Sequence, residues 1–313
     1  MISLSLEQIA KAVDGVLVGN DALVTGSVET DSRLVNAGSL FIAKPGEFTD
    51  GHLFVAKAEE NGAVGAIVER QVADSAVAQI VVSDSVAALG LLAKFVLSKL
   101  RESNSLTVIG ITGSNGKTST KNMLREILSL SGETIAPIES YNNEVGAPIS
   151  MLKTTESTKY LVVELGAGGV GSIEYLANIC KPNIAVILKV GLAHVGEFGG
   201  IETTFQIKSE LARALGSDDQ LVLNADDGLV ASMQDITEAS VHWFGTSENS
   251  GVWASEFDVT LSGTKFALHV GPEKHGVILN ILGEHQVMNA MAALEVSQLL
   301  GLPIKDAIGA LER

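Results

Sequence analysis

The stretch VIGITGSNGKTSTKNML, residues 108 to 124, constrains the fold more than any other part of this sequence. An apolar run that ends in a glycine-rich turn and continues as a helix-forming segment is typical of a strand, a loop and a helix. In such a unit, the backbone amides of the loop and the N-terminus of the helix can surround phosphate groups. The sequence therefore predicts a phosphate-binding loop at the end of a strand.

The spacing of this loop departs from the common form G-x-x-x-x-G-K-[ST], because Ile111 stands where the first glycine would be. Lys117 can neutralise charge between the outer phosphates, and the Thr118 hydroxyl is placed to bind magnesium. A glycine-rich turn with a surface lysine is the alternative, but strand, loop, G-K-T and helix all agree on a nucleotide site. The expected nucleotide contacts are Gly113, Ser114, Asn115, Gly116, Lys117, Thr118 and Ser119.

Alternation of apolar runs with helical segments predicts an α/β fold. From residue 160 to 245, near-continuous apolar strands are separated by helical stretches, which indicates a parallel sheet covered on both faces. From about 251 to 282 the strands alternate without helices. We expect a small α/β N-terminal domain, 1–103, and a P-loop-type ATPase domain, 104–313, with a mainly parallel sheet and a small antiparallel extension.

Charge and composition limit the partners and the compartment. With 21 basic and 37 acidic residues, the net charge of −16 argues against binding of nucleic acid. No apolar run reaches the ~20 residues of a membrane helix, so we expect no membrane insertion. Acidic residues interrupt the start where a secretion signal would be apolar, and the single cysteine, Cys180, cannot form an intrachain disulfide. We therefore expect a cytoplasmic protein.

The loop T-G-S-N-G-K-T-S-T resembles the form T-G-x-x-G-K-T of the Mur ligase and folylpolyglutamate synthase superfamily. The segment ESYNNEVGAPISML, 139 to 152, resembles the N-N-x-I-G-x-P-x-x-x-L segment of the Mur ligases that add D-alanyl-D-alanine. That resemblance implies that Asn142 and Asn143 face the substrate. An Asx turn before a helix remains the alternative for both residues.

Two further segments resemble metal-binding parts of the family. In VVELGAGG, the resemblance makes Glu164 a magnesium ligand, and in the block from 187 to 211 it makes His194 the ligand of a second magnesium ion. Lys208 corresponds to a lysine that the family carries as a carbamate. An ammonium beside a divalent cation would be repelled, whereas a carbamate reverses the charge and supplies oxygen ligands. The block departs from the common pattern at Lys189, Val190 and Leu192.

The resemblance extends to the adenine and to the uridine diphosphate of a precursor. LNADD and LGEHQVMNAMAA resemble segments that border the adenine, although Gln286 stands where asparagine is usual. Helix capping, core packing or a surface turn remains the alternative for each residue. The adenine contacts carried over are Asn224, His285 and Asn289, and the precursor contacts, from residues 30 to 69, are Asp31, Ser32, Arg33, Gly51 and His52.

The resemblance implies ATP-dependent ligation of D-alanyl-D-alanine to UDP-N-acetylmuramoyl-tripeptide through an acyl phosphate, in peptidoglycan precursor synthesis, with two magnesium ions. Lys117, Glu164, His194 and Lys208 would be catalytic. We expect a monomer that lacks the family's C-terminal dipeptide-binding domain and is inactive alone. Another Mur or folylpolyglutamate-type ligase, a non-catalytic nucleotide- or precursor-binding protein, and a kinase remain alternatives.

Overall fold

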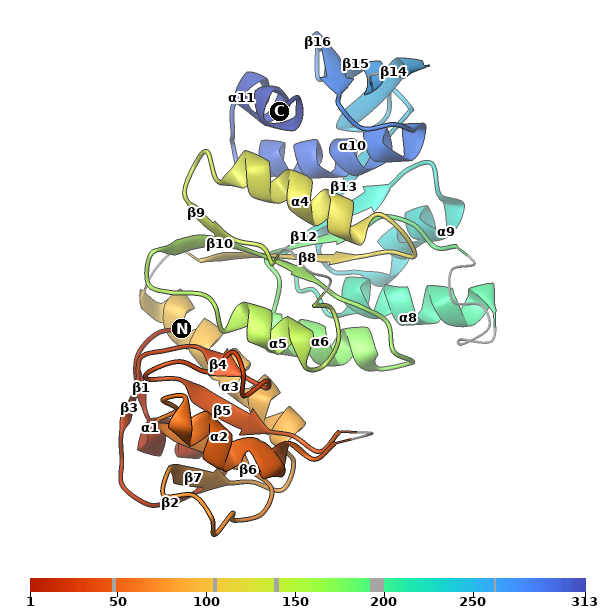
Figure 1. The fold of residues 1–313 in the computed structure, drawn as a ribbon. Helices are drawn as coiled ribbons and strands as arrows, with labels where there is room; N and C mark the ends of the chain where they lie inside the picture. Colours follow the sequence, from red (N-terminus) through yellow and green to blue (C-terminus); the bar gives the residue numbers. More distant parts are fainter. Residues whose placement is uncertain (47–48, 104–105, 138–140, 192–199, 262) are drawn as a thin grey trace. The chain divides into compact units, whose positions relative to one another are not determined.

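The computed structural model describes residues 1–46, 49–103, 106–137, 141–191, 200–261 and 263–313 (Figure 1). The chain divides into two compact units. The first unit is formed by Met1–Ser105 together with Glu144–Ser157, and the second by Leu106–Asn143 together with Thr158–Arg313. The segment Glu144–Ser157 therefore belongs to the first unit, although the residues on both sides of it in the sequence belong to the second.

The first unit is built on a mixed sheet with the strand order β2-β7-β6-β5-β4. Only β2 runs antiparallel to its neighbour; the other pairs are parallel. Every residue of β5 and β6 is buried, which explains why LFIA and GAIV are wholly apolar. The strands are β2 (Val16–Val18), β4 (Val28–Glu29), β5 (Leu40–Ala43), β6 (Gly65–Val68) and β7 (Ala78–Val81), beside the short pair β1 (Leu4–Ser5) and β3 (Leu23–Val24).

Helices complete the first unit. Ser5 caps the first of them through a capping box with Gln8, as expected for a serine followed three residues later by glutamine. The longest, α3, contacts both α1 and α5. The helices are α1 (Leu6–Ala12), η1 (Gly51–Phe54), α2 (Val55–Glu60), α3 (Ser85–Ser103) and α5 (Gly146–Met151).

The second unit contains a larger sheet with the order β16-β15-β14-β13-β12-β11-β8-β10-β9. All pairs from β9 to β14 are parallel, and β14, β15 and β16 pair antiparallel, so the predicted fold class is confirmed. The strands are β8 (Thr107–Thr112), β9 (Glu133–Ile135), β10 (Thr158–Glu164), β11 (Ile184–Ile187), β12 (Gln220–Asn224), β13 (Ser240–Gly245), β14 (Val252–Thr260), β15 (Gly263–Val270) and β16 (Glu273–Leu279).

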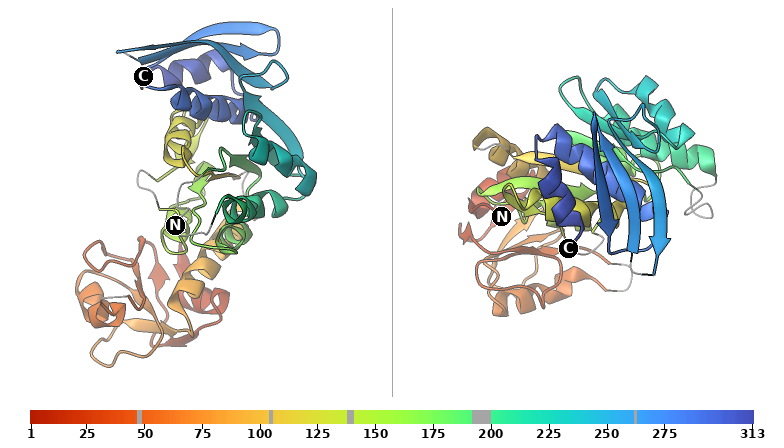
Figure 2. Two further views of the ribbon diagram at one scale, coloured as in Figure 1. Left: turned by 90° about the vertical axis from the view of Figure 1, so that its right-hand side faces the viewer. Right: turned by 90° about the horizontal axis from the view of Figure 1, so that it is seen from above.

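Helices cover both faces of this sheet (Figure 1). On one face, α4 (Lys117–Leu128) packs against β10, and α10 (Glu284–Leu299) lies beside α4, α11 (Ile304–Leu311) and β14. Figure 2 shows the antiparallel strands β14 to β16 next to α10. On the other face, α6 (Ser172–Cys180) and α8 (Ile201–Arg213) contact each other and the strands β8 and β11.

Strand β8 occupies the position at which the chain changes direction across the sheet. From β8 the chain continues to β9 and β10 on one side of it and then to β11 on the other. In open parallel sheets, ligands bind beyond the carboxyl ends of the strands at such a switch point. The loop that follows β8 is therefore at the place where this architecture favours a ligand.

In the described part of the chain, no helix is both long enough and apolar enough to span a bilayer.

Candidate nucleotide-binding site

The loop after β8 is held by the ends of the two neighbouring strands. The Ser114 amide donates to the carbonyl of Lys189 (2.8 Å), and the Gly191 amide donates to the Ser114 hydroxyl (2.9 Å). On the other side, the Thr112 hydroxyl donates to the Leu165 carbonyl (2.9 Å). These bonds fix both flanks of the loop, so its remaining amides can serve a ligand.

Gly116 closes the loop and is the N-cap of α4. Its φ of 88° lies in the left-handed region, which glycine adopts without a steric penalty. A Cβ atom here would also lie 2.3 Å from the side-chain oxygen of Asn289. Gly116 is thus required both by the turn and by the close approach of α10. No side chain caps α4 within the described residues, so the first turn of α4 can receive an anion.

A small cavity of about 230 Å³ opens at the start of α4. It brings together six residues from three separately predicted segments, namely the loop residues Gly116, Lys117, Thr118 and Ser119, together with Asn142 and Glu164. The Lys117 ammonium donates to the Gly113 carbonyl (2.7 Å). Burial lowers the pKa of Lys117, and the charge of Glu164 opposes that shift.

Glu164, the last residue of β10, is only 3% exposed. One carboxylate oxygen accepts a hydrogen bond from the Thr118 hydroxyl (3.2 Å). The other oxygen forms an ion pair with the Lys121 ammonium (2.9 Å), and both side chains of the pair are buried. Lys121 was not among the residues predicted from the sequence. The helical period could have indicated that Lys121 is buried near the site, because it lies four residues after Lys117 and shares the buried face of α4 with Leu124 and Leu128.

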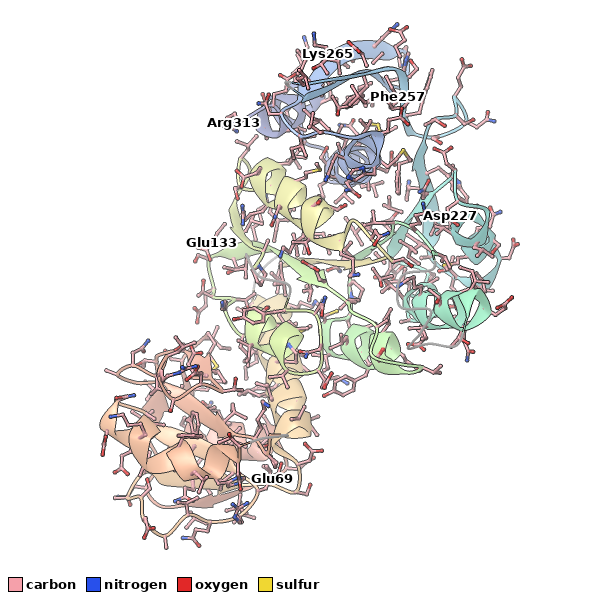
Figure 3. All side chains as sticks on the ribbon, turned by 45° about the vertical axis from the view of Figure 1, so that its right-hand side comes forward. Glu69, Glu133, Asp227, Phe257, Lys265 and Arg313 are labelled. Carbon is pink, nitrogen blue, oxygen red and sulfur yellow. The ribbon has the colours of Figure 1, made fainter. Side chains whose placement is uncertain are left out.

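A second, larger cavity of about 840 Å³ adjoins the first at Gly116. Its apolar part comprises Leu188, Leu229, Phe244, Phe257 and Met288. Its polar part comprises Asn115, Lys189, Asn224, Asp226, Asp227, Thr246, Glu284, His285 and Asn289. Figure 3 labels Asp227, which precedes α9 (Gly228–Ala231), and Phe257 on β14. Charge-binding groups at one end and an apolar chamber at the other match the two ends of a nucleotide.

The predicted adenine contacts differ in how they are held. The Asn224 amide nitrogen donates to the Leu188 carbonyl (2.9 Å), and its oxygen accepts from the Asp226 amide (2.9 Å), so this side chain shapes the cavity wall. Asn289 donates to Gln286 (3.1 Å). His285 is exposed at the cavity.

Lys208 lies on α8 and is only 4% exposed. Burial, followed by the charge of Lys117, lowers its pKa to about 8. His194 and Leu192 fall in 192–199, outside the residues that the structure describes. Within the described residues, no three His, Cys, Asp or Glu side chains are grouped to hold a metal ion.

The predicted precursor contacts lie in the first unit. Arg33 donates to both carboxylate oxygens of Asp31 and lowers the pKa of Asp31 to about 2, while the Arg33 side chain stays 86% exposed. Ser32, which stands between them in the sequence, is buried. Gly51 begins η1, where a Cβ atom would lie 2.6 Å from the Lys44 carbonyl.

The imidazole of His52 is engaged within the first unit. Its Nδ1 lies 2.6 Å from a carboxylate oxygen of Asp50, and its Nε2 accepts a hydrogen bond from the Glu69 amide (2.8 Å). This pattern defines the tautomer, with the proton on Nδ1. The ring is 3% exposed, so His52 supports the D-G-H turn in this conformation. Asn143, in the second unit, is exposed and is not among the residues that line the two cavities.

Both units match domains of known proteins. Residues 111–297 match the Mur ligase middle domain, and residues 25–95 match the Mur ligase family, catalytic domain. The chain is 39% identical to UDP-N-acetylmuramoyl-tripeptide--D-alanyl-D-alanine ligase of Mycobacterium bovis over 336 residues, covering 99% of this chain and 66% of that protein.

Solved structures agree with the sequence comparison. The structure of MurF from Acinetobacter baumannii has a TM-score of 0.90 and 34% identity, covering 99% of this chain and 68% of that one. The MurF ligase from Thermotoga maritima in complex with ADP has a TM-score of 0.80 and 30% identity, covering 91% of this chain and 66% of that one.

Proposed function

Because the chain belongs to the Mur ligase family, we propose that it binds ATP at the loop after β8 and serves the ATP-dependent ligation of D-alanyl-D-alanine to a UDP-N-acetylmuramoyl-tripeptide. The observation that carries the proposal is the pair of cavities that meet at Gly116. The name of the M. bovis relative supplies the substrate class. The chain spans 66% of the length of the M. bovis ligase.

In this proposal, the adenine occupies the larger cavity and the phosphates extend to the smaller one. Phe244, Phe257 and Met288 supply the apolar surface that a base buries, and His285 and Asn289 supply polar groups at its edge. The loop amides and the N-terminus of α4 receive the phosphate oxygens. Lys117, which bonds to the Gly113 carbonyl in this structure, exchanges that carbonyl for a phosphate oxygen.

The reaction proceeds in two steps. The terminal carboxylate of the tripeptide attacks the γ-phosphorus in line, so that a P–O bond forms, the bond to ADP breaks and an acyl phosphate results. The amine of D-alanyl-D-alanine then attacks the acyl carbon, loses a proton and expels phosphate. Lys117 stabilises the charge that develops on the phosphate oxygens, and Asn142, at the same small cavity, orients the acid or the phosphate.

The donor set at the small cavity suits magnesium. The Thr118 hydroxyl and one Glu164 oxygen lie 3.2 Å apart and are oxygen ligands of the kind that magnesium prefers. Bound magnesium would neutralise charge on the nucleotide phosphates. His194 and a carbamate on Lys208 would hold a second ion. The lowered pKa of Lys208, about 8, favours that carbamate because only a neutral amine adds to carbon dioxide.

The first unit would bind the uridine diphosphate of the precursor through Asp31, Ser32, Arg33, Gly51 and His52. The exposed Arg33 guanidinium is the group best suited to a diphosphate, because it can bond to phosphate oxygens in a bidentate manner. The protein would act as a monomer in the cytoplasm.

Calorimetry tests the proposal in two stages. Residues 1–313 are titrated with ADP, with a non-hydrolysable ATP analogue, and with GDP as a control for the base. We expect binding of both adenine nucleotides, abolished by Lys117→Ala, and no binding of GDP. Ligation is then assayed as pentapeptide and phosphate formation, both with this chain and with the longest product of its gene. Nucleotide binding that survives Lys117→Ala unchanged would refute the site, and a stable phosphorylated product in place of an amide would refute the reaction.

A further inference from the structure

Lys121 makes a contact with Glu164 near the small cavity that the proposed reaction does not use. It lies on α4, one turn beyond Lys117, and its side chain is 1% exposed. The residues that line the small cavity include Glu164 but not Lys121. Lys121 therefore does not meet a ligand there, but it does contact a residue that can.

The energetics of burial require a reason for this ion pair. Removing an ammonium and a carboxylate from water costs several kcal/mol per ion, roughly, and the attraction between them often only offsets that cost. An apolar pair of similar volume would serve the core at least as well. A buried lysine paired with a carboxylate at a ligand cavity is thus better explained by what it does to that carboxylate.

The geometry around Glu164 shows what Lys121 controls. The two oxygens of the carboxylate have different partners: Lys121 holds one at 2.9 Å, and Thr118 donates to the other at 3.2 Å. Both partners come from the first turns of α4, and Glu164 itself ends β10. With one oxygen fixed by the ammonium, the carboxylate cannot rotate, and its second oxygen stays beside Thr118 at the cavity.

We propose that Lys121 is a positioning residue for metal-assisted nucleotide binding: it locks the Glu164 carboxylate so that a single oxygen, next to the Thr118 hydroxyl, is presented to the magnesium ion that accompanies the nucleotide. This inference rests on the proposed function, because it assumes that Glu164 meets that ion. Groups that orient a ligand from behind commonly change metal affinity by about 10- to 100-fold when they are removed.

The test is the gain in ADP affinity on addition of Mg²⁺, measured by calorimetry with and without the metal. We expect Lys121→Met to reduce this gain by about tenfold, while the affinity for metal-free ADP is unchanged. Lys121→Arg should restore most of the gain. The double variant Lys121→Met/Glu164→Gln should show the same gain as Glu164→Gln alone, because Lys121 acts only through Glu164.

Arg125→Met is the matched control. It removes one positive charge from the same helix one turn further on, where Arg125 pairs with the exposed Glu126. We expect its gain to equal that of the wild type. Thermal unfolding checks each variant first, and Lys121→Gln replaces Lys121→Met if the latter is unfolded at the temperature of the titration.

The outcomes separate the two proposals. If Glu164→Gln loses the gain but the uncharged variant at Lys121 keeps it, Lys121 only fills space and the inference is wrong, while the metal role of Glu164 stands. If Lys121→Met weakens metal-free and metal-bound ADP equally, its effect is structural and the inference is also wrong. If the wild type shows no gain, or Glu164→Gln keeps it, the metal site proposed at Glu164 fails and this inference fails with it.

Discussion

Replacing Glu210 by alanine should destabilise the second unit more than any exposed acid on the same helix. Glu210, on α8, accepts hydrogen bonds from the amides of Gly171 (2.7 Å), Ile173 (3.1 Å) and Glu174 (3.0 Å) at the start of α6. The side chain is 7% exposed. It therefore caps α6 from a distance and ties the glycine-rich segment after Glu164 to the helix that carries Lys208.

The size of the effect follows from these bonds. A hydrogen bond to a charged group contributes about 1.5–3 kcal/mol, and a carboxylate at a helix N-terminus contributes up to about 1 kcal/mol more. Water can replace part of this because Gly168 is exposed nearby. We expect Glu210→Ala to lower the free energy of unfolding by about 3 kcal/mol, equivalent to a melting temperature lower by about 6–12 °C.

Urea unfolding followed by circular dichroism measures this difference. Glu210→Gln, which keeps an acceptor oxygen, should lose about half as much. Glu202→Ala, which removes an exposed acid from the first turn of α8, is the control and should cost less than about 1 kcal/mol. A Glu210→Ala variant within about 0.5 kcal/mol of the wild type would refute the capping role.

Three further changes test other features of the second unit. Gly116→Ala, at φ 88° and with its Cβ 2.3 Å from Asn289, should weaken ADP binding at least tenfold, roughly, as measured by calorimetry, and unchanged affinity would contradict the loop geometry. In the longest product of the gene, Lys208→Ala should abolish turnover, and the turnover of the wild type should rise with bicarbonate; full activity of the variant would count against the carbamate. Burial raises the pKa of Glu295 from 4.5 to about 7, so the stability contributed by its protonated form is present below pH 4.5 and is lost as the pH rises through about 7. Between those pH values, the free energy of unfolding of Glu295→Gln should therefore rise by about 3 kcal/mol relative to that of the wild type, as measured by urea unfolding. A difference that does not change with pH would exclude the titration of Glu295 as the cause.

Local patterns predicted the elements of the second unit closely. The strands and helical stretches expected between residues 160 and 245 are present, among them the helix α6, Ser172–Cys180, and the strand β12, Gln220–Asn224. Both are bounded by local signals, namely the glycine before α6 and the polar residues after β12. The edge strand β9, Glu133–Ile135, was not predicted, because three half-exposed residues carry little periodicity.

Contacts between distant residues could not be predicted in the same way. The loop and Glu164 were identified by motif, and the structure brings them together with Asn142. By contrast, the cap that Glu210 provides depends on a partner 36 to 39 residues away. The period of α4 placed Lys121 on the buried face, but only the register of β10 beside β8 puts a carboxylate opposite it. Sequence pattern therefore gives the face of a helix, whereas pairing of strands decides what that face meets.

A polar residue in a motif also has structural uses that a sequence does not reveal. His52 was predicted as a precursor contact, and its two ring nitrogens are engaged by Asp50 and by the amide of Glu69, 17 residues away. Its role toward the precursor stays a prediction. The side-chain amide nitrogen of Asn224 likewise donates a hydrogen bond to the Leu188 carbonyl. When such a residue is substituted, the stability of the variant must be measured before a loss of binding is assigned to a lost contact with the ligand.

A crystal structure of this chain grown with ADP and Mg²⁺ would show whether the loop after β8 holds the phosphates of an adenine nucleotide. We expect the β-phosphate to accept hydrogen bonds from the amides around Gly116 and Lys117, and the adenine to lie between Phe257 and His285 in the larger cavity. ADP bound elsewhere, or an empty loop at an ADP concentration that saturates binding in solution, would show that this loop is not the nucleotide-binding site.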